Sequence, residues 1–441
     1  MAILSTQDEA RFETTKRLLA QLINEGLAQA TVEQQGLRLC ASEANPGSTD
    51  RCVRVSTRYL PTSFVQSGLV TSHVRPEILK PPVTLSDGIS EWTELDPEVI
   101  FTFVAPWFTV GVDPASIARV AKELGNSASF QEKWLERRSI NNLLSLTSPS
   151  IEWEQSVVFG HPIHPLHRSF FVLPPLEPVL PEDIPQLLQP SLSFVSVPRD
   201  DLQITGPFEE TIKPLLRKLD LPLVAQNRLV IPCFTRQLPA VFSRFPNATL
   251  IKSVENCFDA QTSIRTLTPR PELGFPYHVK LPLAVQITSA IRTITPWTTH
   301  ASPMVTGILD SIAPSLPSSL WFFREAAAVS GSQSDFDEAK HLACILREDL
   351  EAKARENNEV LIMAGALFER RFYGKPTYSE VCFRLGTDDE KLAWFRRSSS
   401  HNNYHTYFYP LLSPISLFSP LICQMLLRNH PSSGIQLRHR A

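Results

Sequence analysis

Three histidines and one arginine lie close together in the segment GHPIHPLHR, at residues 160–168. No acidic residue occurs from residue 155 to residue 176, so this segment has no carboxylate neighbour in the sequence. Imidazole N–H groups and a guanidinium are hydrogen-bond donors that suit the oxygens of a phosphate or a carboxylate. The segment is therefore a candidate anion site in which His161, His164 and Arg168 would face the ligand.

The residues of this segment alone also allow two other interpretations. In the first, it is a proline-stiffened surface loop whose histidines bond only to the backbone. In the second, His161 and His164 are metal ligands. The metal site is the weaker alternative, because the prolines prevent the helical presentation usual for such pairs and no third ligand lies nearby. An anion site needs further cations from elsewhere in the chain.

The segment from residue 261 to residue 293 concentrates positive charge and hydroxyl groups against a single acid, Glu272. Its cations are Arg265, Arg270, Lys280 and Arg292, and its hydroxyls include Ser263, Thr266 and Thr288. If its first part is extended, Ser263 and Arg265 point to the same face about 7 Å apart, so that both can contact one phosphorylated ligand. Each of these residues taken alone is an ordinary rim residue of a sheet. Together with the histidine segment, they favour a nucleotide site.

The second part of this segment has two structural interpretations. The run KLPLAVQIT (280–288) alternates with the period of a strand, but a strand would separate its ends by about 26 Å, which is too far for one nucleotide. A helix that begins after about Val285 would make Thr288 and Arg292 i, i+4 neighbours, and Pro296 would end it. We expect the helix.

A third charged group lies in ILREDLEAKARE, at residues 345–356. Apolar residues from about Ser334 onward recur with the period of an amphipathic helix, and Arg347 lies within this expected helix. On its own, the group is typical of a solvated helix face with i, i+4 ion pairs.

Length and composition set the class of protein. The chain has 441 residues, 43% hydrophobic and 20% charged, with a net charge of −3, which predicts a globular protein of two or three packed units. This charge gives no general attraction to nucleic acid or to a membrane surface. Seven scattered cysteines without CxxC spacing favour a reducing, cytoplasmic location. Neither the N-terminus nor the proline-broken apolar run at 407–427 is typical of a secretory signal or a spanning helix.

The pattern along the chain predicts an α+β fold in successive regions. Residues 1–150 read as a mainly helical region with some sheet, and residues 151–330 as a β-rich region interrupted by prolines. Residues 331–397 read as helical again. The last segment, 398–441, is rich in Ser, Pro and Leu, and we expect a poorly ordered tail.

Taken in order, GHPIHPLHR, TSIRT, YHVKLPLAVQITSAIRT and ILRE resemble the motifs of the IucA/IucC family, the aerobactin-type siderophore synthetases that work independently of nonribosomal peptide synthetases. The resemblance covers roughly residues 120–395. It implies a cupped-hand fold with a thumb-like domain at 1–150, a fingers-like ATP- and citrate-binding domain at 151–330, and the start of a palm-like domain at 331–397. It also implies that ATP and Mg²⁺ are used to adenylate a carboxylate of citrate, or of a similar polycarboxylate, which then condenses with an amine or a hydroxyl.

The resemblance assigns roles to individual residues. The catalytic residues would be Arg292, Thr288 and His164. Thr288 and Arg292 match residues that meet the nucleotide phosphate and the citrate carboxylate, and the histidines match residues at the triphosphate side of the site. The nucleotide would be bound by Ser263, Arg265, Thr266, Lys280, His161, Arg168 and Arg347. Arg168 stands where many members carry lysine, so a planar guanidinium replaces the compact ammonium group. No metal ligand is assigned within these motifs, and a homodimer is left open.

The resemblance ends after KLAWFRR, at residues 391–397. Members of the family continue into a palm-like domain with a His-Gly-Gln-Asn segment and acidic metal ligands, whereas this sequence has no acidic residue after Glu390. We therefore expect the palm-like domain to be missing or replaced. The alternative function is a truncated, catalytically inactive fragment that binds nucleotide or citrate.

Overall fold

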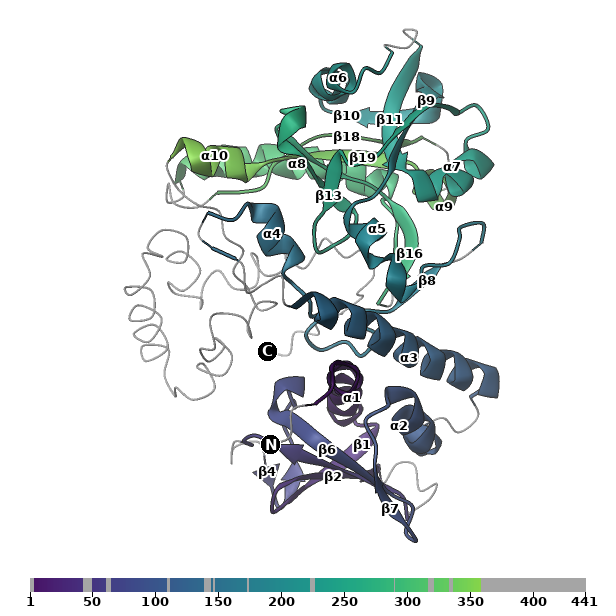
Figure 1. The fold of residues 1–441 in the computed structure, drawn as a ribbon, viewed down its shortest axis with the longest axis vertical. Helices are drawn as coiled ribbons and strands as arrows, with labels where there is room; N and C mark the ends of the chain where they lie inside the picture. Colours follow the sequence, from purple (N-terminus) through teal and green to yellow (C-terminus); the bar gives the residue numbers. More distant parts are fainter. Residues whose placement is uncertain are drawn as a thin grey trace, which may run out of the picture.

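The computed structural model describes residues 4–42, 50–60, 65–108, 112–138, 144–145, 147–172, 174–222, 227–288, 290–315, 321–332 and 336–357. In these ranges, helices accompany four antiparallel sheets, which confirms the expected α+β class (Figure 1). None of the helices in these ranges combines the length and apolar character needed to span a bilayer. The expected tail at 398–441 and most of the expected palm-like segment lie outside the described residues.

The N-terminal region combines helices with a seven-stranded sheet of order β4-β5-β1-β2-β3-β6-β7. Helix α1 (Thr6–Asn24) is capped by Ser5, whose Oγ accepts a hydrogen bond from the Asp8 N–H at 3.0 Å. The strands are β1 (Ala28–Glu33), β2 (Gly36–Ala41), β3 (Cys52–Thr57), β4 (Val65–Gln66), β5 (Leu69–Val70), β6 (Leu79–Ser86) and β7 (Glu91–Thr93). The sheet is more extensive than the sequence indicated for residues 1–150.

Helices α2 (Pro97–Val104) and α3 (Pro114–Glu136) complete this region (Figure 1). The Asp113 carboxylate accepts a hydrogen bond from the Ala115 N–H at 3.3 Å and caps α3, as the Asp-Pro pair suggests. Helix α3 is continuous over 23 residues and includes Gly125 and Ser129.

The residues after α3 build a second region around a six-stranded sheet of order β10-β18-β19-β15-β14-β13. Its strands are β10 (Leu202–Thr205), β13 (Phe258–Ala260), β14 (Thr266–Pro269), β15 (Tyr277–Lys280), β18 (Glu325–Gly331) and β19 (Ala343–Glu348). One three-stranded sheet, β11-β9-β12, contains β9 (Leu192–Pro198), β11 (Arg228–Phe234) and β12 (Thr249–Val254). Another, β17-β16-β8, contains β8 (Phe170–Val172), β16 (Leu283–Ile287) and β17 (Ala290–Arg292). The helices are α4 (Ser150–Gln155), α5 (Ile184–Leu188), α6 (Phe208–Lys218), α7 (Leu238–Arg244), α8 (Pro296–Ile312), α9 (Phe336–Ala339) and α10 (Leu350–Glu356).

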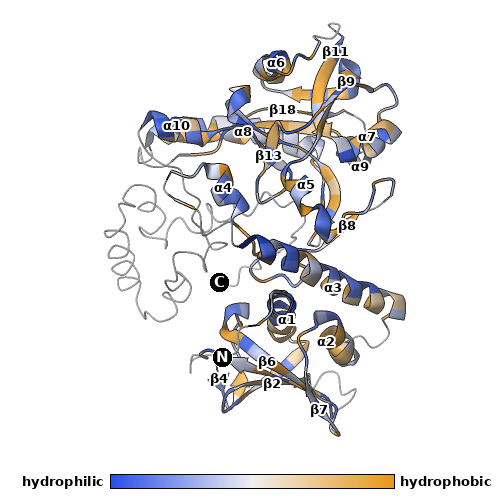
Figure 2. Cartoon of the chain, viewed as in Figure 1, coloured by the Kyte–Doolittle hydropathy of each residue, from blue (hydrophilic) through white to orange (hydrophobic). Residues whose placement is uncertain are grey.

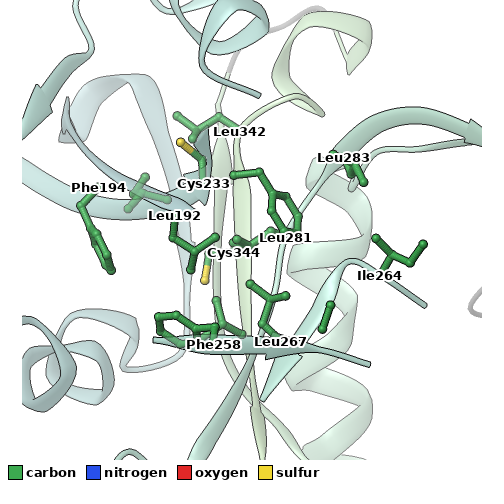
Figure 3. Packing of buried hydrophobic residues seen from close by; sticks show 14 of the residues in the cluster. Leu192, Phe194, Cys233, Phe258, Ile264, Leu267, Leu281, Leu283, Leu342 and Cys344 are labelled. Carbon is green, nitrogen blue, oxygen red and sulfur yellow. The ribbon is translucent and has the colours of Figure 1, made fainter. Parts of the chain in front are cut away.

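Two large hydrophobic cores stabilise these regions, beside a small third cluster of Ile294, Ala328, Ala343 and Ile345. In the larger core, Leu192 of β9 and Cys233 of β11 pack near Leu267 of β14 and Cys344 of β19 (Figure 3). Strands β9, β11 and β18 are mostly hydrophobic along their length, as expected for strands covered on both faces (Figure 2). Helix α3 contributes to both cores, because its first half packs in the N-terminal core and its second half in the larger one.

The helix expected after Val285 is wrong. Strands β16 and β17 pair with each other as antiparallel strands, and β16 also pairs with β8. Leu283 and Val285 are buried, so the alternation in the sequence marked a strand after all. The strand is short, because the chain leaves β15 after Lys280 and re-enters a different sheet. Pro296 begins helix α8 and does not end one.

The helix expected around Arg347 is also wrong. Residues 343–348 form strand β19 between β15 and β18, so the central sheet continues past the boundary expected at residue 330. Ala343, Cys344, Ile345 and Leu346 are all buried. A strand covered on both faces loses the period of two and resembles a helical apolar run.

Candidate anion-binding site

Strand register places several predicted residues on one face of the six-stranded sheet. His278 of β15 and Glu325 of β18 both lie opposite Arg347 of β19. Lys280 follows His278 by two residues, so it points to the same face, and it lies opposite Thr266 of β14. The sheet therefore brings together Lys280, Glu325 and Arg347, which are far apart in the sequence.

Lys280 is buried, and its Nζ lies 3.0 Å from Oε1 of Glu325. Burial lowers the pKa of Lys280; the Glu325 carboxylate opposes this change, whereas the positive charges of Arg265 and Arg347 add to it. Burial would raise the pKa of Glu325, but Lys280 and a hydrogen bond from Ser302 more than offset burial and lower it. One carboxylate therefore lies among several cations.

Arg347 is held in place by its neighbours on the sheet. Its Nη2 donates a hydrogen bond to Oε1 of Gln261 at 2.7 Å and lies 3.2 Å from Nδ1 of His278. Its guanidinium carbon lies 4.6 Å from the ring centre of Phe323. Burial lowers the pKa of Arg347, with Glu325 among the carboxylates that oppose the change. The guanidinium is thus fixed beside Glu325.

Arg265 lies in the turn that leads into β14. Its Nη1 donates a hydrogen bond to the Thr293 carbonyl at 3.1 Å, and its own carbonyl accepts one from the Leu281 N–H at 2.9 Å. Burial and repulsion by Arg292 lower the pKa of Arg265 to about 10, and Glu325 opposes the shift. An anion bound beside Arg265 would offset the unfavourable free energy of keeping this guanidinium charged so close to Arg292.

Arg292 and Thr288 meet across the end of the β16–β17 hairpin. Nη2 of Arg292 donates hydrogen bonds to Oγ1 of Thr288 and to the Ile287 carbonyl, both at 2.9 Å. The turn holds Thr288 at φ 60°, in the left-handed region that β-branched residues rarely adopt. The predicted pair is therefore formed, but by a strained turn and not by a helix.

His161 and His164 lie in the loop between α4 and β8. Nδ1 of His161 accepts a hydrogen bond from the His164 N–H at 3.2 Å, and Nδ1 of His164 accepts one from the Leu166 N–H at 3.0 Å. A neutral histidine that accepts at Nδ1 carries its proton at Nε2. Burial, and then the charge of Arg292, lower the pKa of His164. At neutral pH, His164 is therefore a neutral Nε2–H donor near Arg292.

The histidine loop is anchored to the N-terminal region. Nε of Arg17 on α1 donates a hydrogen bond to the His161 carbonyl at 2.9 Å, and Oγ of Ser127 on α3 donates one to the Pro165 carbonyl at 3.2 Å. A Cβ at Gly160 would lie 2.2 Å from a backbone oxygen of the same loop, so glycine is needed there. The loop is therefore tightly packed against α1 and α3.

The Arg168 side chain also helps to hold the histidine loop in place. Its Nη2 donates hydrogen bonds to the Val157 carbonyl at 2.7 Å and the Phe159 carbonyl at 3.0 Å. Its guanidinium carbon lies 4.2 Å from the ring centre of Trp134, and the side chain is buried. These contacts give Arg168 a structural role in the loop, and its contact with a nucleotide stays a prediction.

The extended geometry expected for Ser263 and Arg265 is wrong. The residues between β13 and β14 form a turn in which Ile264 has φ 67°. Oγ of Ser263, which is exposed, accepts a hydrogen bond from the Thr266 N–H at 3.3 Å. The roles of Ser263 and of the buried Thr266 in nucleotide binding stay predictions.

We call Arg265, Lys280, Arg292 and Arg347 the cationic cluster. The charge of Arg292 acts on His164 and Arg265, and those of Arg265 and Arg347 act on Lys280, so the cluster is continuous from the histidine loop to β19. Such a concentration of cations, one buried and three half-buried, suits a ligand with several negative charges. In chemical terms, it can bind a polyphosphate or a polycarboxylate and stabilise charge that develops on either.

Sequence reasoning missed Glu325, the carboxylate inside the cluster, and the supporting residues His278 and Gln261. A signal for Glu325 was present in FREAAAVSG, where one acid begins a strongly apolar run. An acid at the end of a buried strand is unusual and indicates a specific partner.

A model of the IucA / IucC family matches residues 192–369. The chain is also 43% identical over 413 residues to the NRPS-independent siderophore synthetase-like protein ankE of Aspergillus thermomutatus, an alignment that covers 90% of this chain and 68% of the relative.

Solved structures share the fold at low sequence identity. The petrobactin biosynthesis protein AsbB of Bacillus anthracis matches with a TM-score of 0.59 at 16% identity, over 79% of this chain and 59% of that protein. ATP-bound aerobactin synthetase IucA of Klebsiella pneumoniae matches with a TM-score of 0.58 at 12% identity, over 80% of this chain and 62% of that protein. The chain thus spans less than two thirds of the length of these two proteins.

Proposed function

The chain belongs to the IucA/IucC family of siderophore synthetases, and from this premise we propose that it uses ATP to adenylate a carboxylate of citrate or a related acid and transfers the acyl group to an amine or a hydroxyl. The observation that carries the proposal is the cationic cluster, in which Arg265, Lys280 and Arg347 act on the Glu325 carboxylate and Arg292 lies between Arg265 and the neutral donor His164. The ATP bound to the Klebsiella neighbour supports ATP as the nucleotide.

In the first step, a carboxylate oxygen of the acid attacks the α-phosphorus of ATP. The bond from this phosphorus to the leaving pyrophosphate oxygen breaks, which yields an acyl-adenylate and pyrophosphate. In the second step, the amine or hydroxyl attacks the acyl carbon, AMP leaves, and the nucleophile gives up its proton. Neither step needs a nucleophilic side chain, so catalysis rests on positioning and on stabilising negative charge.

We assign the roles by position in the cluster. Arg265 and Lys280 would bind phosphate oxygens. Arg292, oriented by Thr288, lies toward the histidine loop and would hold the substrate carboxylate against the α-phosphate. His164 would donate a hydrogen bond from its Nε2–H to an oxygen of the α-phosphate.

Magnesium normally accompanies ATP and would offset charge on the phosphates. In the ranges that the structure describes, no three His, Cys, Asp or Glu side chains gather in a way that could hold a metal ion. These residues therefore do not supply a magnesium site, and we derive no step through the metal.

The direct test is citrate-dependent exchange of labelled pyrophosphate into ATP. We expect exchange by the wild type and a loss of at least about a hundredfold in Arg292→Met, since a preorganised charge contact is removed. Arg270→Met is the matched control, because Arg270 pairs with Asp259 at 3.1 Å, outside the cluster. Equal exchange by Arg292→Met would overturn the assigned role. Binding of ATP and citrate without exchange would support the inactive nucleotide- or citrate-binding alternative.

We further propose that the protein acts in the cytoplasm on small molecules, without nucleic-acid or membrane partners. Fractionation of cells that express the tagged protein tests the location. Sedimentation of the purified protein tests whether it forms the homodimer left open by the sequence.

A further inference from the structure

Glu325 is an unexpected residue for a site that binds anions. Its carboxylate lies 3.0 Å from Nζ of Lys280, and the two side chains are 14% and 9% exposed. A buried ion pair adds little net stability, because desolvation of the two charges offsets their attraction. A carboxylate at this place also repels a phosphate. Its position is therefore better explained by an effect on its neighbours than by the ion pair alone.

Glu325 is itself fixed by helix α8. Its N–H donates a hydrogen bond to Oγ1 of Thr306 at 3.0 Å, and its carboxylate accepts a hydrogen bond from Ser302. Both hydroxyls lie on the same side of the helix, four residues apart. The carboxylate is thus positioned by one element, α8, while Lys280 is positioned by another, β15.

We propose that Glu325 is a positioning residue for Lys280: its carboxylate orients the buried ammonium within the cationic cluster and keeps it charged, so that Lys280 can bind an anion. The inference rests on the proposed function in one respect only, which is that the bound anion is ATP. It adds to the site a role for a residue that would not contact the ligand.

The proposal has a consequence for pH. The charged groups that act on Lys280 are Glu325 on β18, Arg265 in the turn before β14 and Arg347 on β19. Helix α8 contributes only uncharged hydroxyl groups to the contacts of Glu325 described above. Burial and the two arginines lower the pKa of Lys280, and Glu325 opposes them. Removing the carboxylate should lower this pKa further. Lys280 would then lose its proton, and with it part of the anion affinity, as the pH rises from neutral.

The test compares Glu325→Gln with the wild type in ATP titrations by calorimetry at about pH 7.5 and about pH 9. We expect the wild type to change less than about threefold between these values and Glu325→Gln to lose about tenfold. Glu348→Gln is the matched control, because Glu348 lies on β19 next to Arg347 but on the opposite face. It should follow the wild type.

The double variant Lys280→Arg, Glu325→Gln decides which cation titrates. A guanidinium stays charged over this range, so the double variant should bind ATP with little change between the two pH values. Persistent pH dependence in the double variant, or none in Glu325→Gln, would overturn the proposal. If Glu325→Gln does not fold, Glu325→Asp serves in its place. Its shorter side chain should give a smaller shift in the same direction, and an unchanged profile would count against the proposal.

A second readout is independent of ATP. Labelling of Lys280 by acetic anhydride, read by peptide mass spectrometry, depends on the fraction of neutral amine and should begin at lower pH in Glu325→Gln than in the wild type. Identical labelling curves would refute the role of Glu325. If the wild type binds no ATP but the labelling curve of Glu325→Gln is still shifted from that of the wild type, the proposed function alone is refuted.

Discussion

Replacing Arg265 with methionine should have opposite effects on ligand binding and on stability. Arg265 is half-buried, and its pKa is lowered to about 10 by burial and by repulsion from Arg292. The shift from 12.5 corresponds to at most about 3 kcal/mol of unfavourable interaction with the charged form. Because solvent screens part of it and the hydrogen bond to Thr293 is lost, we expect Arg265→Met to raise the free energy of unfolding by about 1 kcal/mol.

The sign of this effect can be checked against pH. The folded-state pKa lies below the unfolded one, so the charged arginine is disfavoured by folding at every pH below about 10. The cost of Arg265, and hence the gain in Arg265→Met, should therefore be constant near neutral pH.

The same substitution would remove the proposed charge-assisted contact to phosphate, and such contacts contribute about 1.5–3 kcal/mol, so ATP affinity should fall at least about tenfold. Denaturant unfolding without ligand measures the first effect, and calorimetry with ATP measures the second. Arg270→Met, which loses an ion pair to Asp259, should instead be neutral or slightly destabilised, with unchanged ATP affinity. An Arg265→Met protein that is destabilised by more than 1 kcal/mol and binds ATP normally would show that Arg265 is structural.

Three further substitutions test the histidine loop and His341, a buried histidine outside the cationic cluster whose Nδ1 lies 3.4 Å from Nε2 of Gln237. His164→Ala should weaken ATP binding about fivefold, because one neutral donor is lost; metal analysis of protein purified without chelator should find the same zinc content in both proteins. Arg168→Met should lower the free energy of unfolding by about 2–4 kcal/mol, since two carbonyls and the Trp134 ring lose their partner, while ATP affinity of the folded protein stays near the wild-type value. Burial lowers the pKa of His341 to about 4, so the unfolded chain takes up a proton that the folded one does not between pH 6.5 and about 4. His341 should account for about 2 kcal/mol of the unfolding free energy that the wild type loses across this window, so His341→Gln should lose less by about that amount, as measured by urea unfolding at each pH.

The sequence predicted the residue types of the site better than the elements that carry them. Arg265, Lys280 and Arg292 could be found because cations gathered with few acids in one segment. The pair Thr288 and Arg292 was also expected to meet, but through a helix, because the strand alternative was judged as one straight strand. The chain in fact changes sheets after Lys280, and this break is set by packing against β8, far away in the sequence.

The contribution of Glu325 could not be read from local sequence for a similar reason. Its neighbours Lys280 and Arg347 reach it only through the register of β15, β19 and β18. Strand register depends on which faces are buried, and this depends on the whole sheet. Arg347 was likewise placed in a helix because its strand is covered on both sides.

Helix α3 has 23 residues and is therefore about 34 Å long, with Leu124 in the N-terminal core and Phe130 and Trp134 in the larger one. Neither core can melt alone without unwinding half of a continuous helix and exposing its apolar residues to water. The two cores should therefore unfold as one thermodynamic unit, with equal calorimetric and van't Hoff enthalpies in a single transition. Leu124→Ala should lower the melting temperature of that shared transition, and the larger core should unfold at the same lowered temperature. The histidine loop, held by hydrogen bonds from both α1 and α3, would be lost in the same event, so binding competence and global folding should disappear at the same temperature.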